Sequence, residues 1–130
     1  MSARDVVAMT ATIVLASIAA LHLAWAIAPR ASTGAPLTVP EAHGRPLFQP
    51  SRAATLAVAI ALSIAASVVA MRVRVFVIGL AVVFLARAIG EFRYIGFFKR
   101  VRGTRFSRWD SWLYSPLCLA LAGACGVVAS

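Results

Sequence analysis

The stretch VFVIGLAVVFLARAIGEFRYIGFF, residues 75–98, begins as a membrane-spanning helix does and then changes character. Residues 75–86 carry no polar side chain, but Arg87, Glu91 and Arg93 follow before the apolar residues end. A charged side chain at the bilayer centre costs about 2.5–3.5 kcal/mol on insertion scales, so it usually faces protein or water. The stretch therefore predicts a membrane helix with a polar face turned toward the inside of a helix bundle.

The overall composition indicates the same environment. Hydrophobic residues make up 62% of the 130 residues and charged residues only 13%, whereas soluble domains average roughly half apolar and a quarter charged. A soluble fold of this size could not bury so much apolar surface, because small domains leave much of their chain exposed. We therefore expect the lipid bilayer to cover the remainder.

Four apolar runs approach the roughly 20 residues that a spanning helix needs. The predicted spans are residues 6–28, 53–71, 75–98 and 113–129. A proline-rich loop, 29–52, separates the first two spans, and Ser51 is suited to cap the second helix. The first run is longer than the core of a signal peptide, which favours a retained span. The predicted fold class is all-α, with residues 1–130 forming one integral membrane four-helix bundle.

The net charge of +9 would suggest a nucleic-acid partner in a soluble protein. Here the basic residues gather at the ends of apolar runs, as in proteins that contact anionic lipid headgroups, so we expect no nucleic acid. A basic loop, 99–112, is predicted to be a membrane anchor, and a specific phosphate site is the alternative. The anchor residues are Lys99, Arg100, Arg102, Arg105 and Arg108.

The distribution of basic residues also predicts an orientation. Loops 29–52 and 99–112 share one side of a four-span protein and carry eight Lys or Arg residues, against three on the other side. Cytoplasmic loops are enriched in these residues. Both loops are therefore expected in the cytoplasm, and both termini outside.

One polar layer is predicted inside the bundle. In a continuous helix Arg87 and Glu91 lie one turn apart and can pair, and Tyr94 shares their face. His22 lies six residues before the end of the first span and Glu91 seven before the end of the third, so both should lie about 10 Å below the same surface. The predicted ligand-binding residues are His22, Trp25, Arg87, Glu91, Arg93, Tyr94 and Tyr114.

Each of these residues also has a structural interpretation. The Arg87–Glu91 pair could serve only to fix helix register, because desolvation offsets much of the attraction in a buried pair. His22 could simply form an intramembrane hydrogen bond, Trp25 could belong to the interfacial aromatic belt, and Asp110 could cap the fourth helix. The sequence alone leaves both interpretations open.

Catalytic and metal-binding signatures are absent from the sequence. No CxxC, HExxH, GxGxxG or P-loop pattern occurs, so no catalytic residue, metal or cofactor is predicted. Cys118 and Cys125 are two helical turns apart, too far for a disulfide with each other. With one histidine in a span, haem held by two histidines of one chain is excluded.

The segment RAIGEFRYIGFFKRVRGTRFSRWDSWLYSPLCLALA, residues 87–122, resembles the bacterial membrane proteins catalogued as domain of unknown function 3995. LHLAWA (21–26) and PSRAATLAVAIAL (50–62) extend the resemblance over nearly the whole chain. It implies a four-span protein of the bacterial inner membrane. It supplies no activity, so no catalytic residue is carried over.

Three functions remain open from the sequence. The first is a non-enzymatic membrane protein whose polar pocket binds or passes a small anionic or lipid-like ligand. Arg87 and Arg93 would hold the anion, Glu91 would orient Arg87, and His22 could exchange a proton. A transport path would need a homo-oligomer. The second is an accessory subunit of a larger membrane complex, and the third is a membrane enzyme or redox carrier.

Overall fold

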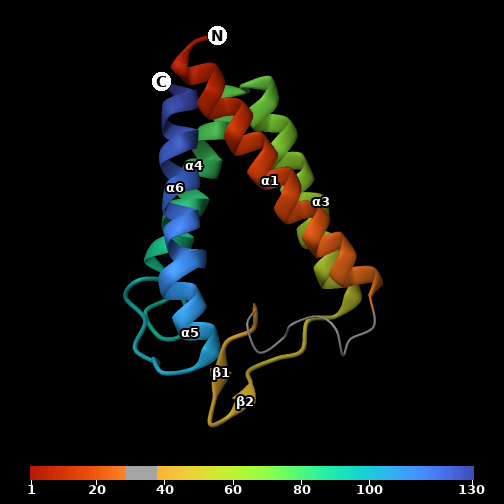
Figure 1. Ribbon diagram of the computed structural model, residues 1–130, viewed down its shortest axis with the longest axis vertical. Coiled ribbons are helices and arrows are strands. Elements are labelled where there is room, and N and C mark those ends of the chain that lie inside the picture. The colour runs from red at the N-terminus through yellow and green to blue at the C-terminus, as the bar shows by residue number, and fades with distance from the viewer. Residues whose placement is uncertain (29–37) are drawn as a thin grey trace.

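The computed structural model describes residues 1–28 and 38–130, so expectations for residues 29–37, including Arg30, lie outside the described part. The elements are α1 (Ala3–Ile27), β1 (Glu41–Ala42), β2 (Arg45–Pro46), α3 (Arg52–Met71), α4 (Arg74–Ile89), α5 (Arg105–Trp109), η2 (Asp110–Tyr114) and α6 (Ser115–Ala129). Figure 1 shows two helix pairs, α1 with α3 and α4 with α6, which meet near the two termini and diverge toward the opposite end. We call the end near the termini the closed end. The opposite end, which holds the hairpin and residues 90–104, we call the basic end.

The helices meet in a small core at the closed end. Leu15, Val69, Val77 and Val128, one from each of the four long helices, are at most 2% exposed. The other buried residues of this core are mostly alanines, which let helix backbones approach closely. The four helices therefore form one packed unit at this end.

Polar groups tie the helix termini together at the closed end. Ser2 and Asp5 form a capping box at the start of α1. The Asp5 carboxylate also pairs with the guanidinium of Arg72, which ends α3 in a left-handed conformation with φ 56°. Arg4 donates from Nη2 to the carbonyl oxygen of Val128 at 2.6 Å, so it satisfies a free carbonyl in the last turn of α6.

The start of α3 agrees with the sequence. Ser51 caps the helix, with its Oγ accepting a hydrogen bond from the Ala54 backbone N–H at 3.0 Å, so that prediction is confirmed. The hairpin before it turns through His43 and Gly44, with φ 53° and 75°, as two-residue hairpin turns require. Val39, just before the hairpin, is 2% exposed.

The third helix is shorter than the sequence suggested. α4 ends at Ile89, so the prediction of a helix over residues 75–98 is wrong beyond that residue. Gly90 and Gly96 adopt φ 86° and 90°, and their backbones cross so closely that a Cβ on either would overlap the chain beside the other. The Phe97 N–H donates to Ala88 O at 2.8 Å and closes the loop. The chain therefore turns back at Gly90.

The last helical stretch begins earlier than predicted. Thr104 caps α5, with its Oγ accepting from the Ser107 N–H at 3.0 Å, and helical structure continues through η2 and α6 to Ala129. The expected loop 99–112 therefore ends at residue 104 rather than 112. η2 is one wide turn of π-helix, a feature often found at functional sites. Asp110 lies inside this helical stretch and does not cap it.

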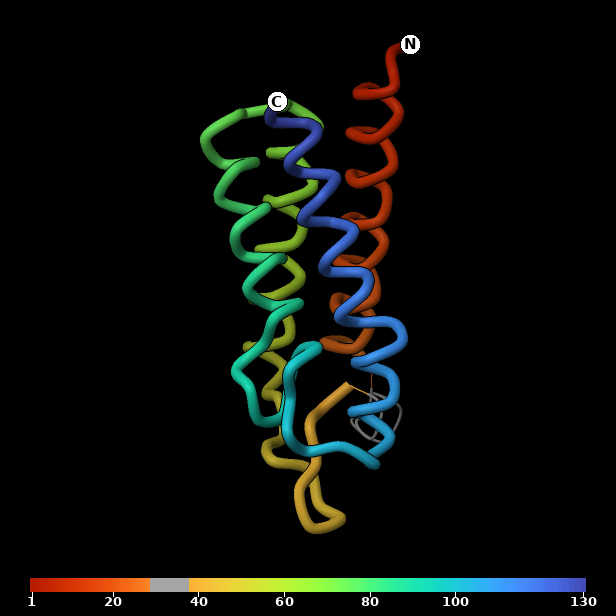
Figure 2. Tube along the Cα trace, turned by 90° about the vertical axis from the view of Figure 1, so that its left-hand side faces the viewer, coloured from red at the N-terminus to blue at the C-terminus, as the bar shows by residue number. Residues whose placement is uncertain are grey.

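Among residues 1–28 and 38–130, three helical stretches are long and apolar enough to cross a membrane, namely Ala3–Ile27, Arg52–Met71 and Arg105–Ala129. α4 is also apolar but has only 16 residues. The predicted all-α class is therefore confirmed, with three helices that can span a bilayer by length and composition. Figure 2 shows that residues 90–104, between α4 and α5, lie at the same end of the molecule as the hairpin.

Candidate functional site

Asp110 is the centre of a buried polar network at the basic end. The residue has no exposed surface. Its Oδ1 accepts a hydrogen bond from Arg87 Nη2 at 2.8 Å, and its Oδ2 accepts from Lys99 Nζ at 3.0 Å and from the Gly96 N–H at 2.8 Å. A buried carboxylate is tolerated only with such compensation. Together with Ser111, these residues form what we call the Asp110 network.

Lys99 is an internal member of this network. The residue is 3% exposed, and its ammonium group donates to Asp110 Oδ2, to Gly96 O at 3.1 Å and to Ser111 Oγ at 2.6 Å. These three acceptors use all three N–H donors of the group. The structure therefore places Lys99 inside the protein, and not at the surface where a membrane anchor was expected.

Arg87 contributes charge that the network does not neutralise. Its Nη1 is buried without a hydrogen-bond partner among the residues that the structure describes, while its side chain as a whole is 31% exposed. Arg87 and Lys99 bring two positive charges to one carboxylate. The network therefore keeps one net positive charge and a free donor. Ser115 Oγ, next to η2, is also buried and has no hydrogen-bond partner in the described part of the chain.

Glu91 does not pair with Arg87. α4 ends before Glu91, so the two residues no longer occupy successive turns of one helix, and the expected pair is replaced by Arg87–Asp110. Glu91 instead binds its own loop, where Oε1 accepts from the backbone N–H groups of Arg93 at 3.2 Å, Ile95 at 3.1 Å, and Tyr94. Its carboxylate thus holds the loop 90–96 in shape.

The other predicted pocket residues form separate contacts. The Arg93 guanidinium lies 5.1 Å from the centre of the Tyr94 ring, an arrangement in which the ring attracts the cation. On α1, His22 Nδ1 donates to Ile18 O at 2.8 Å, and the imidazole meets the Trp25 ring edge-on at 5.1 Å.

Tyr114 packs against Phe106, with ring centres 5.9 Å apart. Within residues 1–28 and 38–130, no hydrogen bond or ion pair joins His22 to the Asp110 network. The structure places the predicted residue Arg87 in the Asp110 network and Tyr114 in the same π-helical turn as Asp110, whereas the sequence did not place Asp110 at the centre of a network. The signal was present, since Asp110 is one of only four acidic residues in the chain.

Exposed basic and aromatic residues lie close to the network in the sequence. Arg100, Arg102, Arg105 and Arg108 are all exposed, and Arg102 also donates to Phe97 O at 2.9 Å. Exposed aromatic residues lie beside them in sequence, with Phe98 63% and Trp112 85% accessible. This combination is typical of a protein surface at the boundary between hydrocarbon and headgroups.

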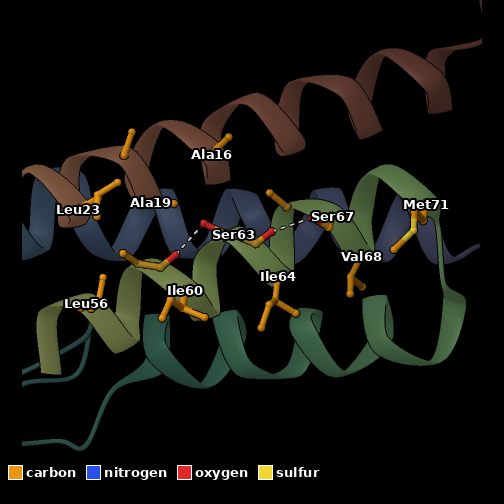
Figure 3. Close-up of a pocket in the computed structure, with 13 residues that line it drawn as sticks. Ala16, Ala19, Leu23, Leu56, Ile60, Ser63, Ile64, Ser67, Val68 and Met71 are labelled. Carbon is orange, nitrogen blue, oxygen red and sulfur yellow. Dashed lines mark hydrogen bonds between the residues drawn. The ribbon is translucent and has the colours of Figure 1, made fainter. Parts of the chain in front are cut away.

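An open groove of about 690 Å³ lies between α1 and α3, away from this network (Figure 3). It is lined by alanines and larger aliphatic residues, and none of the predicted site residues takes part. Its two hydroxyls bond within α3, where Ser63 donates to Ala59 O and Ser67 to Ser63 O. The groove therefore offers an apolar surface without a free hydroxyl donor.

The described residues bring no group of three or more His, Cys, Asp or Glu side chains together. Comparison with known proteins gives one match, to the family described as "Protein of unknown function (DUF3995)", over residues 15–125. No curated protein and no solved structure matches the chain. The family match spans most of the sequence, including α3, α4 and the Asp110 network. The chain therefore belongs to the DUF3995 family.

Proposed function

We propose that this protein crosses the membrane four times and binds anionic phospholipid headgroups at its basic end, without catalysing a reaction. The observation that carries the proposal is the Asp110 network, which holds the buried Lys99 and the partly exposed Arg87 against one buried carboxylate. The network also fixes the loop and the helix start that carry Arg100, Arg102, Arg105 and Arg108. An excess of positive charge is therefore concentrated at one level of the molecule.

A crossing by α4 follows from the path of the chain. α3 ends at the closed end, and the last helical stretch begins at the basic end (Figure 1). If both cross the membrane, the segment between them must cross too. The exposed side chains of α4 support this, because Val75, Phe76 and Val82 are 76%, 63% and 62% exposed, and large exposed apolar patches mark contact with a membrane or with a partner protein.

The chemistry of the basic end suits phosphate groups. A guanidinium can donate two parallel hydrogen bonds to phosphate oxygens, which makes arginine a better phosphate ligand than lysine. A basic residue near an anionic membrane surface gains about 1 kcal/mol from electrostatic attraction. By the enrichment of cytoplasmic loops in basic residues, this end faces the cytoplasm, and the bacterial inner membrane is the membrane we propose.

Thermal unfolding in detergent tests the proposal. Added phosphatidylglycerol should raise the unfolding midpoint of the wild-type protein more than added phosphatidylcholine does. The combined variant Arg100→Gln, Arg102→Gln, Arg105→Gln and Arg108→Gln should lose most of that difference. Arg74→Gln, an exposed arginine at the closed end, is the matched control and should keep it. Equal stabilisation of the wild type by the two lipids would refute headgroup binding.

A further inference from the structure

The distance between the charged residues at the two ends of the helix differs between α3 and α4. On α3, Arg52 and Arg72 are twenty positions apart, so with a rise of about 1.5 Å per residue they are separated by about 30 Å. On α4, Arg74 and Arg87 are thirteen positions apart, which gives about 20 Å. The apolar section between the charged residues is therefore much shorter on α4 than on α3.

Neither end of α4 can extend this section. At the closed end, Arg72 and Arg74 follow directly on α3. At the basic end, Arg87 is bound to the buried Asp110, and the chain turns back at Gly90. Several polar groups of the loop form hydrogen bonds within the protein, for example the Arg100 N–H, which donates to Arg93 O at 3.0 Å.

α6 beside it gives a similar length. Trp112 is 85% exposed at the level of the Asp110 network and is the type of residue that marks the membrane interface. From Trp112 to Val128, whose carbonyl oxygen binds Arg4 at the closed end, the helix rises about 24 Å. A typical hydrocarbon layer is about 30 Å thick.

The longer pair can adapt to a thin layer by its angle. Figure 1 shows α1 and α3 running obliquely to α4 and α6. A helix that is long for its membrane shortens its projection by tilting, whereas a short one draws the bilayer surface toward it. The oblique pair and the short pair are therefore compatible with one thin layer.

We infer that the protein fits a hydrocarbon layer of about 20–24 Å and thins a thicker bilayer around α4. The inference rests on the proposed crossing by α4. The partner it identifies is a phospholipid with short acyl chains, or a bilayer deformed along the exposed face of α4.

Reconstitution in phosphatidylcholines of increasing chain length tests the inference. We expect the highest unfolding temperature in dimyristoleoyl or dipalmitoleoyl lipid, and a steady decrease through dioleoyl to dierucoyl lipid. Arg74→Leu, which lengthens the apolar section of α4, should move the optimum toward longer chains. Arg52→Leu, on the longer α3, should leave it in place.

An unfolding temperature that rises from dimyristoleoyl to dierucoyl lipid would overturn the inference, as would equal shifts in the two variants. Accessibility of cysteines placed at Val73 and Thr104 in the same vesicles separates the two proposals. If the two positions are labelled from opposite sides, α4 crosses, and a wrong thickness profile counts against thinning alone. If they are labelled from the same side, the four-span proposal fails as well.

Discussion

Asp110 connects three consecutive parts of the chain, namely α4, the loop after it and the last helical stretch. Its carboxylate accepts hydrogen bonds from Arg87 in α4 and from Gly96 and Lys99 in the following loop. A buried ion pair is not a net source of stability by itself, because desolvation offsets much of the attraction. Once the charges are buried, however, each depends on the others. The network therefore fixes how the loop sits against the last helical stretch.

Asp110→Asn tests this dependence. The substitution leaves Arg87 and Lys99 without a buried counter-charge, and removing one partner of such a group costs about 3–5 kcal/mol of unfolding free energy. Denaturation in mixed detergent micelles measures the loss. Asp5→Asn, which removes a partly exposed pair with Arg72 at the closed end, is the control and should cost less. Losses of equal size would contradict the central position of Asp110.

The sequence identified Arg87 as a charge facing protein but gave it the wrong partner. Pairing was assigned to Glu91 because residues four apart meet on a helix. The actual partner is 23 positions away, and side-chain spacing along one helix contains no information about such a contact. The depth argument for His22 likewise depended on an unbroken third helix, which the structure does not have.

At the level of elements, Gly90, which follows the last residue of α4, and Gly96, in the loop, decide where the loop begins. Both adopt positive φ, and the backbone around each glycine occupies the space that a Cβ on the other glycine would need. A hydropathy average does not reveal this helix end, because the residues on both sides of it are apolar. For this reason the sequence predicted the existence of the helices and the cap at Ser51, but placed the end of α4 and the start of α5 too late.

Gly96→Ala should therefore be costly. The new methyl group overlaps the backbone at Ile89 and is held at φ 90°, a strain of about 1–3 kcal/mol. Gly79→Ala is the matched control, because Gly79 lies inside α4 with nothing near its added Cβ. It should stabilise the helix by about 0.5–1 kcal/mol. If the two substitutions changed the unfolding free energy in the same direction, the result would argue against the close crossing of the backbones at Gly90 and Gly96.

At the scale of the whole molecule, the closed end and the basic end differ in the residues they contain. The closed end joins four helices through a small apolar core and through Arg4 and Arg72, which bind helix termini or their caps. The basic end collects the exposed arginines, the aromatic residues and the buried Asp110 network. Composition and charge distribution along the sequence predicted this asymmetry, because both depend on residue type and not on exact contacts.

The proposed four-span topology gives this asymmetry a role in headgroup binding, because it places the whole basic end on one side of the membrane. Labelling of single cysteines by an impermeant maleimide in intact cells tests it most directly. Val73→Cys, in the turn between α3 and α4, should be labelled from outside, while Thr104→Cys should react only after the cells are opened. The unsubstituted protein, with Cys118 and Cys125 inside α6, is the background control. Labelling of both positions in intact cells, or of neither, would contradict the crossing by α4.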